Sequence, residues 1–130
     1  MINYFFVIAG LLLLAAFIIH SIGGSKEYHI IKPNKGTNEF QYWTLGATCF
    51  QMVTVDLLLT GIFALLMGIE VIPYEYYLAL FITLIYAGYL VMWLVTLAIN
   101  RVEKSFYISL GQWTIFLSAL ILMSVGIFTQ

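Results

Sequence analysis

Residues 40–68 have the sequence FQYWTLGATCFQMVTVDLLLTGIFALLMG, and this stretch decides the fold because it carries only one charged side chain, that of Asp56. A membrane-spanning α-helix needs about 20 mostly apolar residues to cross a hydrocarbon core of ~30 Å. The stretch is longer than that, so it can tilt or extend beyond one face of the bilayer. It lacks the alternation of apolar and polar residues that a barrel strand requires, whereas a helix satisfies its backbone groups internally. The stretch therefore predicts a transmembrane helix.

The rest of the chain has the same character. It contains 130 residues, of which 63% are hydrophobic and 8% are charged, and its mean hydropathy is +1.03. Soluble domains average about 45–50% apolar and about 25% charged residues, so the polar surface of a water-soluble globule is missing here. At about 20 residues for each span, the length accommodates one membrane domain of four helices and leaves no room for a soluble catalytic domain.

The formal charges mark the boundaries between the predicted helices. All but one of the charged residues fall in three short segments, which hold Lys26, Glu27, Lys32, Lys35 and Glu39, then Glu70 and Glu75, then Arg101, Glu103 and Lys104. The four apolar runs between them predict helices at about residues 3–22, 40–68, 76–99 and 106–128. We therefore expect an all-α fold, an integral membrane four-helix bundle that forms a single domain over residues 1–130.

The basic residues also predict the orientation in the membrane. Every Lys and Arg lies either in the connecting loop 23–39 or in residues 100–105, whereas residues 69–75 carry only glutamates as charges. The positive-inside rule then places the two basic loops in the cytoplasm and both termini outside. The first run lacks the basic segment and the cleavage site of a signal peptide, so we expect it to remain as the first helix. The predicted location is a bacterial inner membrane, which the chain crosses several times.

Asp56 is the one charge that a helix boundary does not explain. A carboxylate at the centre of a bilayer costs roughly 2.5–3.5 kcal/mol on insertion scales, so it should be buried, paired or protonated. Asp56 precedes Ile69 by 13 residues, and Tyr89 follows Tyr76, the first residue of the next helix, by the same number. At ~1.5 Å per residue both lie about 20 Å from the outer loop. Since a short loop makes these helices antiparallel neighbours, we expect the hydroxyl of Tyr89 or Tyr86 to donate to the Asp56 carboxyl.

Two interpretations of Asp56 stay open. In the first, Asp56 binds a proton or a cation, with Thr60 on the same helical stripe and Tyr86 and Tyr89 beside it, because an ionisable residue inside a membrane is a functional candidate by default. In the second, a protonated or hydrogen-bonded Asp56 only fixes the register of two helices. A proton relay across the whole membrane would need further titratable groups, and Asp56 is the only acid in the predicted spans.

A second polar group is expected toward the cytoplasmic side of the membrane. Its members lie near the cytoplasmic ends of the four predicted helices and comprise His20, Ser21, Gln51, Asn100 and Gln112. They could line a shallow pocket that opens inward. Alternatively, they tie helices together through interhelical hydrogen bonds, which are worth about 0.6 kcal/mol each.

The two histidines raise the question of a cofactor. His20 and His29 lie nine residues apart on the same side of the membrane. Haem in a membrane protein usually takes its axial histidines from facing helices, and zinc needs three or four converging ligands. We therefore predict no metal site and no cofactor, with haem bound through His20 or His29 as the alternative.

The remaining patterns favour packing over chemistry. Gly61, Ala64 and Gly68 are small residues at helical spacing, which allow helices to approach closely. The sequence has no G-x-S-x-G, H-E-x-x-H, Walker A or dinucleotide-binding motif and no basic face for nucleic acid. We therefore expect no nucleic-acid partner and no enzymatic activity, with a membrane enzyme or a redox-cofactor protein kept as an alternative.

The first half of the chain carries a short combination of motifs. His20-Ser21 ends the first predicted helix, Gly24 and Glu27 follow, Lys32-Pro33 comes next, and Gln51 lies in the second predicted helix. In this combination the chain resembles a group of small uncharacterised bacterial four-helix membrane proteins, in which Gln51 would correspond to a position often held by a second histidine. The resemblance implies a four-helix membrane fold and draws attention to His20, and it implies no substrate.

Two functions from different classes are consistent with these features. The first is a non-enzymatic accessory or scaffold subunit of a larger membrane complex, whose polar stripes serve helix association. The alternative is an oligomeric transporter or channel in which Asp56 handles a proton or a cation. The expected partners are the lipid bilayer and either other membrane subunits or further copies of the chain.

Overall fold

The computed structural model describes residues 1–130, and all its regular elements are helical. In chain order they are α1 (Tyr4–Ile19), the π-helical turn η1 (His20–Gly24), α2 (Ser25–Ile30), α3 (Asn38–Gly68), α4 (Tyr76–Ile99), α5 (Lys104–Ser109) and α6 (Gln112–Phe128). Three continuous segments are long and apolar enough to cross a membrane, namely Tyr4–Ile30, Asn38–Gly68 and Tyr76–Ile99. The apolar helix α6 is shorter, with 17 residues. The chain is therefore all-helical, and the length and apolar character of its long helices are typical of a membrane protein.

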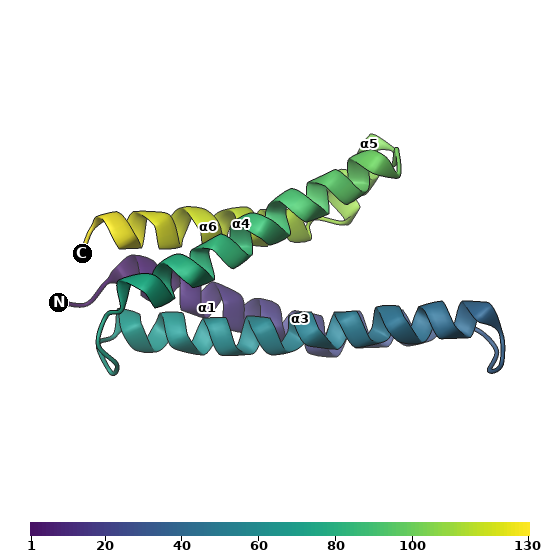
Figure 1. Ribbon diagram of the computed structural model, residues 1–130, viewed down its shortest axis with the longest axis horizontal. Helices are drawn as coiled ribbons and strands as arrows, with labels where there is room; N and C mark the ends of the chain where they lie inside the picture. The colour runs from purple at the N-terminus through teal and green to yellow at the C-terminus, as the bar shows by residue number, and fades with distance from the viewer.

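The long helices run between two ends of the molecule. Both termini and the connection between α3 and α4 lie at one end, and the connection between α2 and α3 lies at the other (Figure 1). α1 packs along α3 and against α6, and α4 packs along α6. α3 and α4 start close together at their connection and then diverge, so that α5 lies well away from α3 (Figure 1). The expectation that α3 and α4 pack as antiparallel neighbours is therefore wrong, because α4 packs along α6 and reaches α3 only through side chains.

The first helical segment is longer than the sequence predicts. The expected helix ended at residue 22 and was followed by a loop over residues 23–39, but the chain stays helical through η1 and α2 to Ile30. Gly24 lies within this helical segment, at the point where the segment passes the ring of Phe50 on α3. A Cβ added at Gly24 would lie 2.6 Å from Cζ of Phe50. The connecting loop is reduced to residues 31–37.

A reciprocal pair of hydrogen bonds holds α2 against the start of α3. The hydroxyl of Tyr28 donates to the backbone carbonyl of Trp43 at 3.1 Å, and the indole Nε1 of Trp43 donates to the carbonyl of Tyr28 at 3.1 Å. Nζ of Lys32 lies 5.1 Å from the centroid of the Trp43 ring, which is cation–π geometry. This arrangement satisfies the polar tips of two aromatic side chains. They lie at the end of the molecule that holds the connection between α2 and α3 with Lys32 and Lys35, which we call the basic end.

The last predicted helix, over residues 106–128, is divided into two. α5 ends at Ser109 and α6 begins at Gln112, with Leu110 in a non-helical conformation between them. In a continuous helix the carbonyl of Tyr107 would accept from the backbone four residues later, at Gly111. Here the indole Nε1 of Trp113 donates to that carbonyl at 2.8 Å instead. The side chain of Trp113 thus satisfies a carbonyl that the break leaves without its helical donor.

Glycines set the distance between α1 and α3. A Cβ at Gly10 would lie 2.6 Å from the backbone N of Leu65, and a Cβ at Gly68 would lie 2.6 Å from the backbone N of Val7. The small stripe on α3 that includes Gly61 is buried against α1, in agreement with its predicted role in packing. Backbones that approach this closely gain dispersion contacts along the whole helix pair.

Candidate functional site

A polar network joins α3 to α4 midway along α3. Tyr89 on α4 donates a hydrogen bond to Oδ2 of Asp56 on α3. The hydroxyl of Tyr86 lies 2.6 Å from Oγ1 of Thr60, and Thr60 donates to the backbone carbonyl of Asp56 at 2.5 Å. Because Thr60 has only one hydroxyl hydrogen, Tyr86 is the donor in the bond between these two side chains. Both tyrosines therefore direct their hydroxyls at the turn of α3 that carries Asp56.

The structure brings together all four residues that we expected around the carboxylate. Tyr86 and Thr60 are buried, whereas Asp56 and Tyr89 are half-buried. Of the two tyrosines expected as donors to Asp56, Tyr89 is the one that donates. Tyr86 serves Thr60 instead, so the two tyrosines have different partners.

Phe116 on α6 fixes the aromatic face of α4. The centroid of its ring lies 6.3 Å from that of Tyr86, 5.7 Å from that of Tyr89 and 6.0 Å from that of Trp93. The rings of Tyr86 and Tyr89 also meet edge to face, with centroids 6.0 Å apart. Such aromatic contacts contribute roughly 0.5–1.5 kcal/mol each beyond the area that they bury. α6 therefore holds the tyrosines from one side while their hydroxyls reach α3 on the other.

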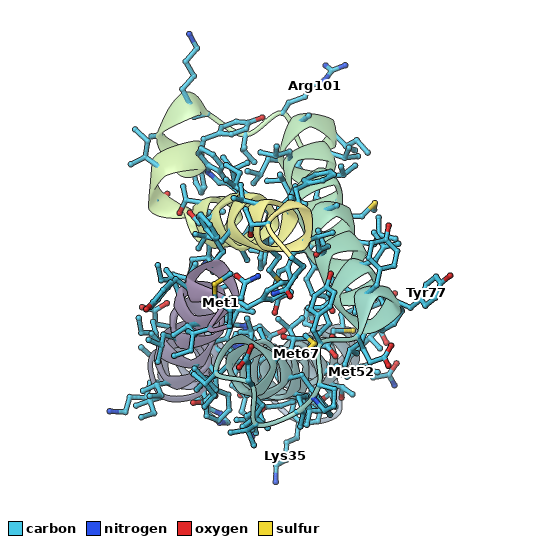
Figure 2. The ribbon with its side chains drawn as sticks, turned by 90° about the vertical axis from the view of Figure 1, so that its left-hand side faces the viewer. Met1, Lys35, Met52, Met67, Tyr77 and Arg101 are labelled. Carbon is cyan, nitrogen blue, oxygen red and sulfur yellow. The ribbon has the colours of Figure 1, made fainter.

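Beyond this network, on the side toward α5, the neighbouring positions of α3 and α4 are uncovered. Cys49 and Met52 lie two turns and one turn from Asp56, and Met92 and Thr96 follow Tyr89 on α4. Met52 is 65% exposed and Met92 is 61% exposed, and Cys49 and Thr96 are also exposed. In the view along the helices, Met52 lies on the side of α3 where α4 begins (Figure 2). We call this surface the α3–α4 face, and it comprises Cys49, Met52, Asp56, Tyr89, Met92 and Thr96.

Two polar atoms in or beside this face have no hydrogen-bond partner in the chain. Oδ2 of Asp56 accepts from Tyr89, but Oδ1 accepts from no group. Nε1 of Trp93, one turn beyond Tyr89, is buried and has no acceptor. The half-buried carboxylate can therefore still accept a proton, a cation or a hydrogen bond from a further donor.

The five residues expected to line a pocket at the cytoplasmic side are not brought together. Nδ1 of His20 lies 3.1 Å from Oγ1 of Thr54, and the His20 ring stacks on Phe50 with centroids 3.8 Å apart. The other members bond locally or not at all: Ser21 donates to the carbonyl of Ile18, Asn100 donates to the carbonyl of Thr96, and Gln51 and Gln112 are exposed. The divergence of α4 from α3 explains this result, because it carries Asn100 and α5 away from the end of α3 that holds Gln51.

Gln51 lines a small cavity that is separate from the pocket expected at the cytoplasmic side. This cavity has a volume of about 110 Å³ and lies between α2 and α3, where Tyr28, Trp43 and Phe50 are among its lining residues. His29 borders it, but the His29 ring lies against Trp43 and the His20 ring lies against Phe50. The two histidines thus have separate aromatic partners, and no group of three or more His, Cys, Asp or Glu side chains is placed to hold a metal ion.

Asn3 is a residue whose importance the sequence analysis missed. Its side chain caps α1 by accepting from the backbone N–H groups of Phe5 and Phe6, and its Nδ2 donates to the carbonyl of Gly126 at 2.8 Å. Its backbone N–H donates to the carbonyl of Gly68 at 2.9 Å. Asn3 therefore joins the ends of α1, α3 and α6. An asparagine directly before a long apolar run is an N-cap signal that could have identified the first of these roles.

Tyr74 lies in the connection between α3 and α4, beside a cavity of about 320 Å³. Its ring meets that of Phe6 edge to face at 5.9 Å, and its hydroxyl is buried without a partner. Burial raises the pKa of the Tyr74 hydroxyl, and the nearby Tyr76 raises this pKa further. The hydroxyl therefore stays protonated and offers no charge for binding a cation.

Comparison with known proteins finds no match to this sequence among family models, curated proteins or solved structures. Function is therefore inferred from the geometry alone.

Proposed function

We propose that the chain is a four-span integral membrane protein that acts as a non-enzymatic accessory or scaffold subunit of a larger membrane complex. The spans would be α1 with α2, then α3, then α4, and finally α5 with α6. Both termini would lie outside, and the two basic connections would lie in the cytoplasm of a bacterial inner membrane. The placement of the termini and the α3–α4 connection at one end of the molecule is consistent with this topology (Figure 1).

The observation that carries the proposal is the incomplete contact between α3 and α4. A bundle that functions alone would be expected to close around the polar groups inside its span, because hydrocarbon offers them no partners. Here the α3–α4 face leaves one carboxylate oxygen of Asp56 without a donor. A face of this kind suits contact with another membrane protein better than contact with lipid.

The test is the size and composition of the native assembly. We expect the tagged chain, extracted from its own membrane in a mild detergent, to elute together with other membrane subunits at a fixed ratio. The absorbance spectrum of that material should show no Soret band. Elution as a homo-oligomer without other subunits would contradict the accessory role, and a Soret band would point to haem.

One observation favours a second candidate, an oligomeric transporter or channel for protons or cations. The half-buried carboxylate of Asp56 retains a free oxygen in the middle of the predicted span, where a travelling proton or cation could bind. This candidate predicts that Asp56→Asn abolishes flux of protons or alkali cations into proteoliposomes and leaves the assembly unchanged. Loss of assembly in that variant, with no flux in the parent protein, would favour the accessory role.

A further inference from the structure

We propose that the α3–α4 face docks one transmembrane helix of a partner subunit, and that this helix carries a lysine or an arginine at the depth of Asp56. The inference rests on the proposed accessory role and adds the chemistry of the partner. In the complex, the cation of the partner binds Oδ1 of Asp56 while Tyr89 continues to donate to Oδ2.

The chain satisfies the carboxyl group of Asp56 only in part. A single hydrogen bond from Tyr89 occupies one of the two oxygens of a group that offers about four acceptor positions. Lipid tails cannot supply donors to the rest, and ionisable side chains inside a membrane normally pair with other polar or charged groups. The free oxygen therefore calls for a donor from outside the chain, and a cation is the donor that also neutralises the charge.

The second step is that the chain itself offers no cation to Asp56. Asp56 lies 18 residues beyond Asn38, the first residue of α3, which is about 27 Å along the helix from the loop that holds Lys32 and Lys35. Arg101 follows Tyr89 by 12 residues, or about 18 Å along α4. The only ion pair in the structure joins the terminal amino group to Glu70 at the opposite end. No basic side chain of the chain therefore pairs with Asp56.

The third step separates a partner helix from a second copy of this chain. A second copy would carry its lysines and arginine at the same end positions, and so would present no cation at the depth of Asp56. Its one basic side chain at a similar depth is His20, which is already held between Thr54 and Phe50. Two copies that met through this face would bring two carboxylates together. Charge complementarity therefore selects a different chain.

The fourth step concerns the rest of the face. On either side of the acid, the face offers the exposed methionines Met52 and Met92, together with the small side chains of Cys49 and Thr96. Methionine has three rotatable bonds and a polarisable sulfur, so it adapts to the side chains of an incoming helix. The face thus combines one specific charge with an adaptable apolar surround.

Cys49 provides a built-in reporter, because it is the only cysteine and precedes Asp56 by seven residues, or two helical turns. The chain is reconstituted in phosphatidylcholine vesicles with a synthetic leucine-rich helix of about 22 residues. This probe has one central lysine and one cysteine two turns away on the same face of the helix. Two versions of the probe are made, one with the cysteine before the lysine in sequence and one with the cysteine after it. The matched probe has leucine in place of lysine. The rate of disulfide formation with Cys49 is then measured.

We expect the lysine probe to cross-link at least about tenfold faster than the leucine probe, a ratio that corresponds to about 1.4 kcal/mol. Asp56→Asn should lower the cross-linking rate of the lysine probe to that of the leucine probe. Val55→Ala on the same helix is the control, because Val55 is exposed and lies outside the α3–α4 face. It leaves the carboxylate and its bond from Tyr89 in place and should keep the preference for lysine. If Asp56→Asn does not fold, the comparison of the two probes on the parent protein decides the outcome.

Two results would overturn the proposal. Equal rates for the two probes would mean that the face accepts any apolar helix or lipid. Disulfide dimers through Cys49 that form faster than either probe product would assign the face to a second copy. A chain that co-purifies with other subunits but shows no preference for lysine loses the docking proposal and keeps the accessory role. A chain that purifies only as a homo-oligomer loses the accessory role itself.

Discussion

At the scale of single residues, two tyrosines on one helix have different tasks. Tyr86 is buried and completes a hydrogen bond to Thr60, whose own hydrogen goes to the backbone of α3. Tyr89 is half-buried and donates to the carboxylate of Asp56. Both rings pack against Phe116 of α6, and each side chain extends from there to α3. The difference between their acceptors, one neutral and one ionisable, can be measured.

We predict that Tyr89→Phe lowers the free energy of unfolding by about 1–2 kcal/mol, because it leaves a carboxylate inside the predicted span without its donor. Tyr86→Phe should cost less, about 0.6 kcal/mol, since Thr60 keeps its bond to the Asp56 carbonyl. Each variant keeps the ring that packs on Phe116, so the two serve as controls for each other. Unfolding in mixed micelles with increasing dodecyl sulfate measures both values, and a larger loss for Tyr86→Phe would contradict the assignment.

Arithmetic on the sequence could predict that Asp56 and Tyr89 lie at the same depth, because both residues are counted from the same short loop along helices of known rise. The same arithmetic could not separate Tyr89 from Tyr86, since that choice depends on the rotation of α4 and on the position of Phe116. It also could not predict that His20 turns to Thr54, because that contact depends on how deeply α1 packs against α3. The depth of each side chain along its helix could therefore be predicted from the sequence. The direction in which each side chain points depends on tertiary packing.

At the scale of elements, the two helix pairs differ in how they pack. α1 and α3 approach backbone to backbone at Gly10 and Gly68. The contact between α4 and α6 is instead filled by large side chains, with Phe116 against the aromatic residues of α4. A glycine contact tolerates no added volume, whereas an aromatic contact can repack. The two pairs should therefore respond differently to the addition of a methyl group.

Gly10→Ala should destabilise the protein by about 1–3 kcal/mol, because the new Cβ would lie 2.6 Å from a backbone nitrogen of α3 that cannot rotate away. Gly88→Ala on α4 is the control, since no atom lies within 4 Å of the Cβ it would add. We expect that variant to be neutral or more stable, as alanine favours the helix. Thermal unfolding followed by circular dichroism in detergent compares them, and equal losses would contradict a close contact at Gly10.

Helix boundaries show what sequence patterns can and cannot provide at this scale. The predicted bounds of α4 match those observed, because charged and turn-forming residues flank an uninterrupted apolar run. The continuation of α1 through Gly23 and Gly24 could not be predicted, because it depends on the ring of Phe50 lying beside Gly24. The break before α6 depends similarly on the indole of Trp113 reaching a backbone carbonyl. In both cases a contact between a side chain and the backbone accompanies the departure from the predicted boundary.

At the scale of the whole molecule, the chain consists of two helix pairs that share one end. α1 lies along α3 and α4 lies along α6, while α1 also contacts α6. The pairs are joined near the termini, where Asn3 bonds to α3 and α6, and they separate toward the basic end (Figure 1). Divergent pairs of this kind should show a distance between α3 and α4 that increases along the molecule.

We predict this increase for spin labels placed in a Cys49→Ser background. A pair at Phe63 and Phe81 reports on the joined end, and a pair at Leu45 and Ile99 reports on the basic end, all four being exposed positions. The second distance should exceed the first by about one helix diameter, ~10 Å. Double electron–electron resonance in lipid nanodiscs gives both values. Equal distances would show that α3 and α4 stay equally far apart along their lengths and would remove the basis of the α3–α4 face.

The separation of Asp56 from Tyr89 along the chain has a consequence for biosynthesis. The carboxylate is made 33 residues before the tyrosine that bonds to it. At about 5–20 residues per second, translation takes roughly 2–7 s to supply that partner. During this interval α3 can already pair with α1 through their glycines, while its acid has no donor from its own chain. A neighbouring subunit already in the membrane could supply the first counter-charge, which would couple the order of synthesis to the order of assembly.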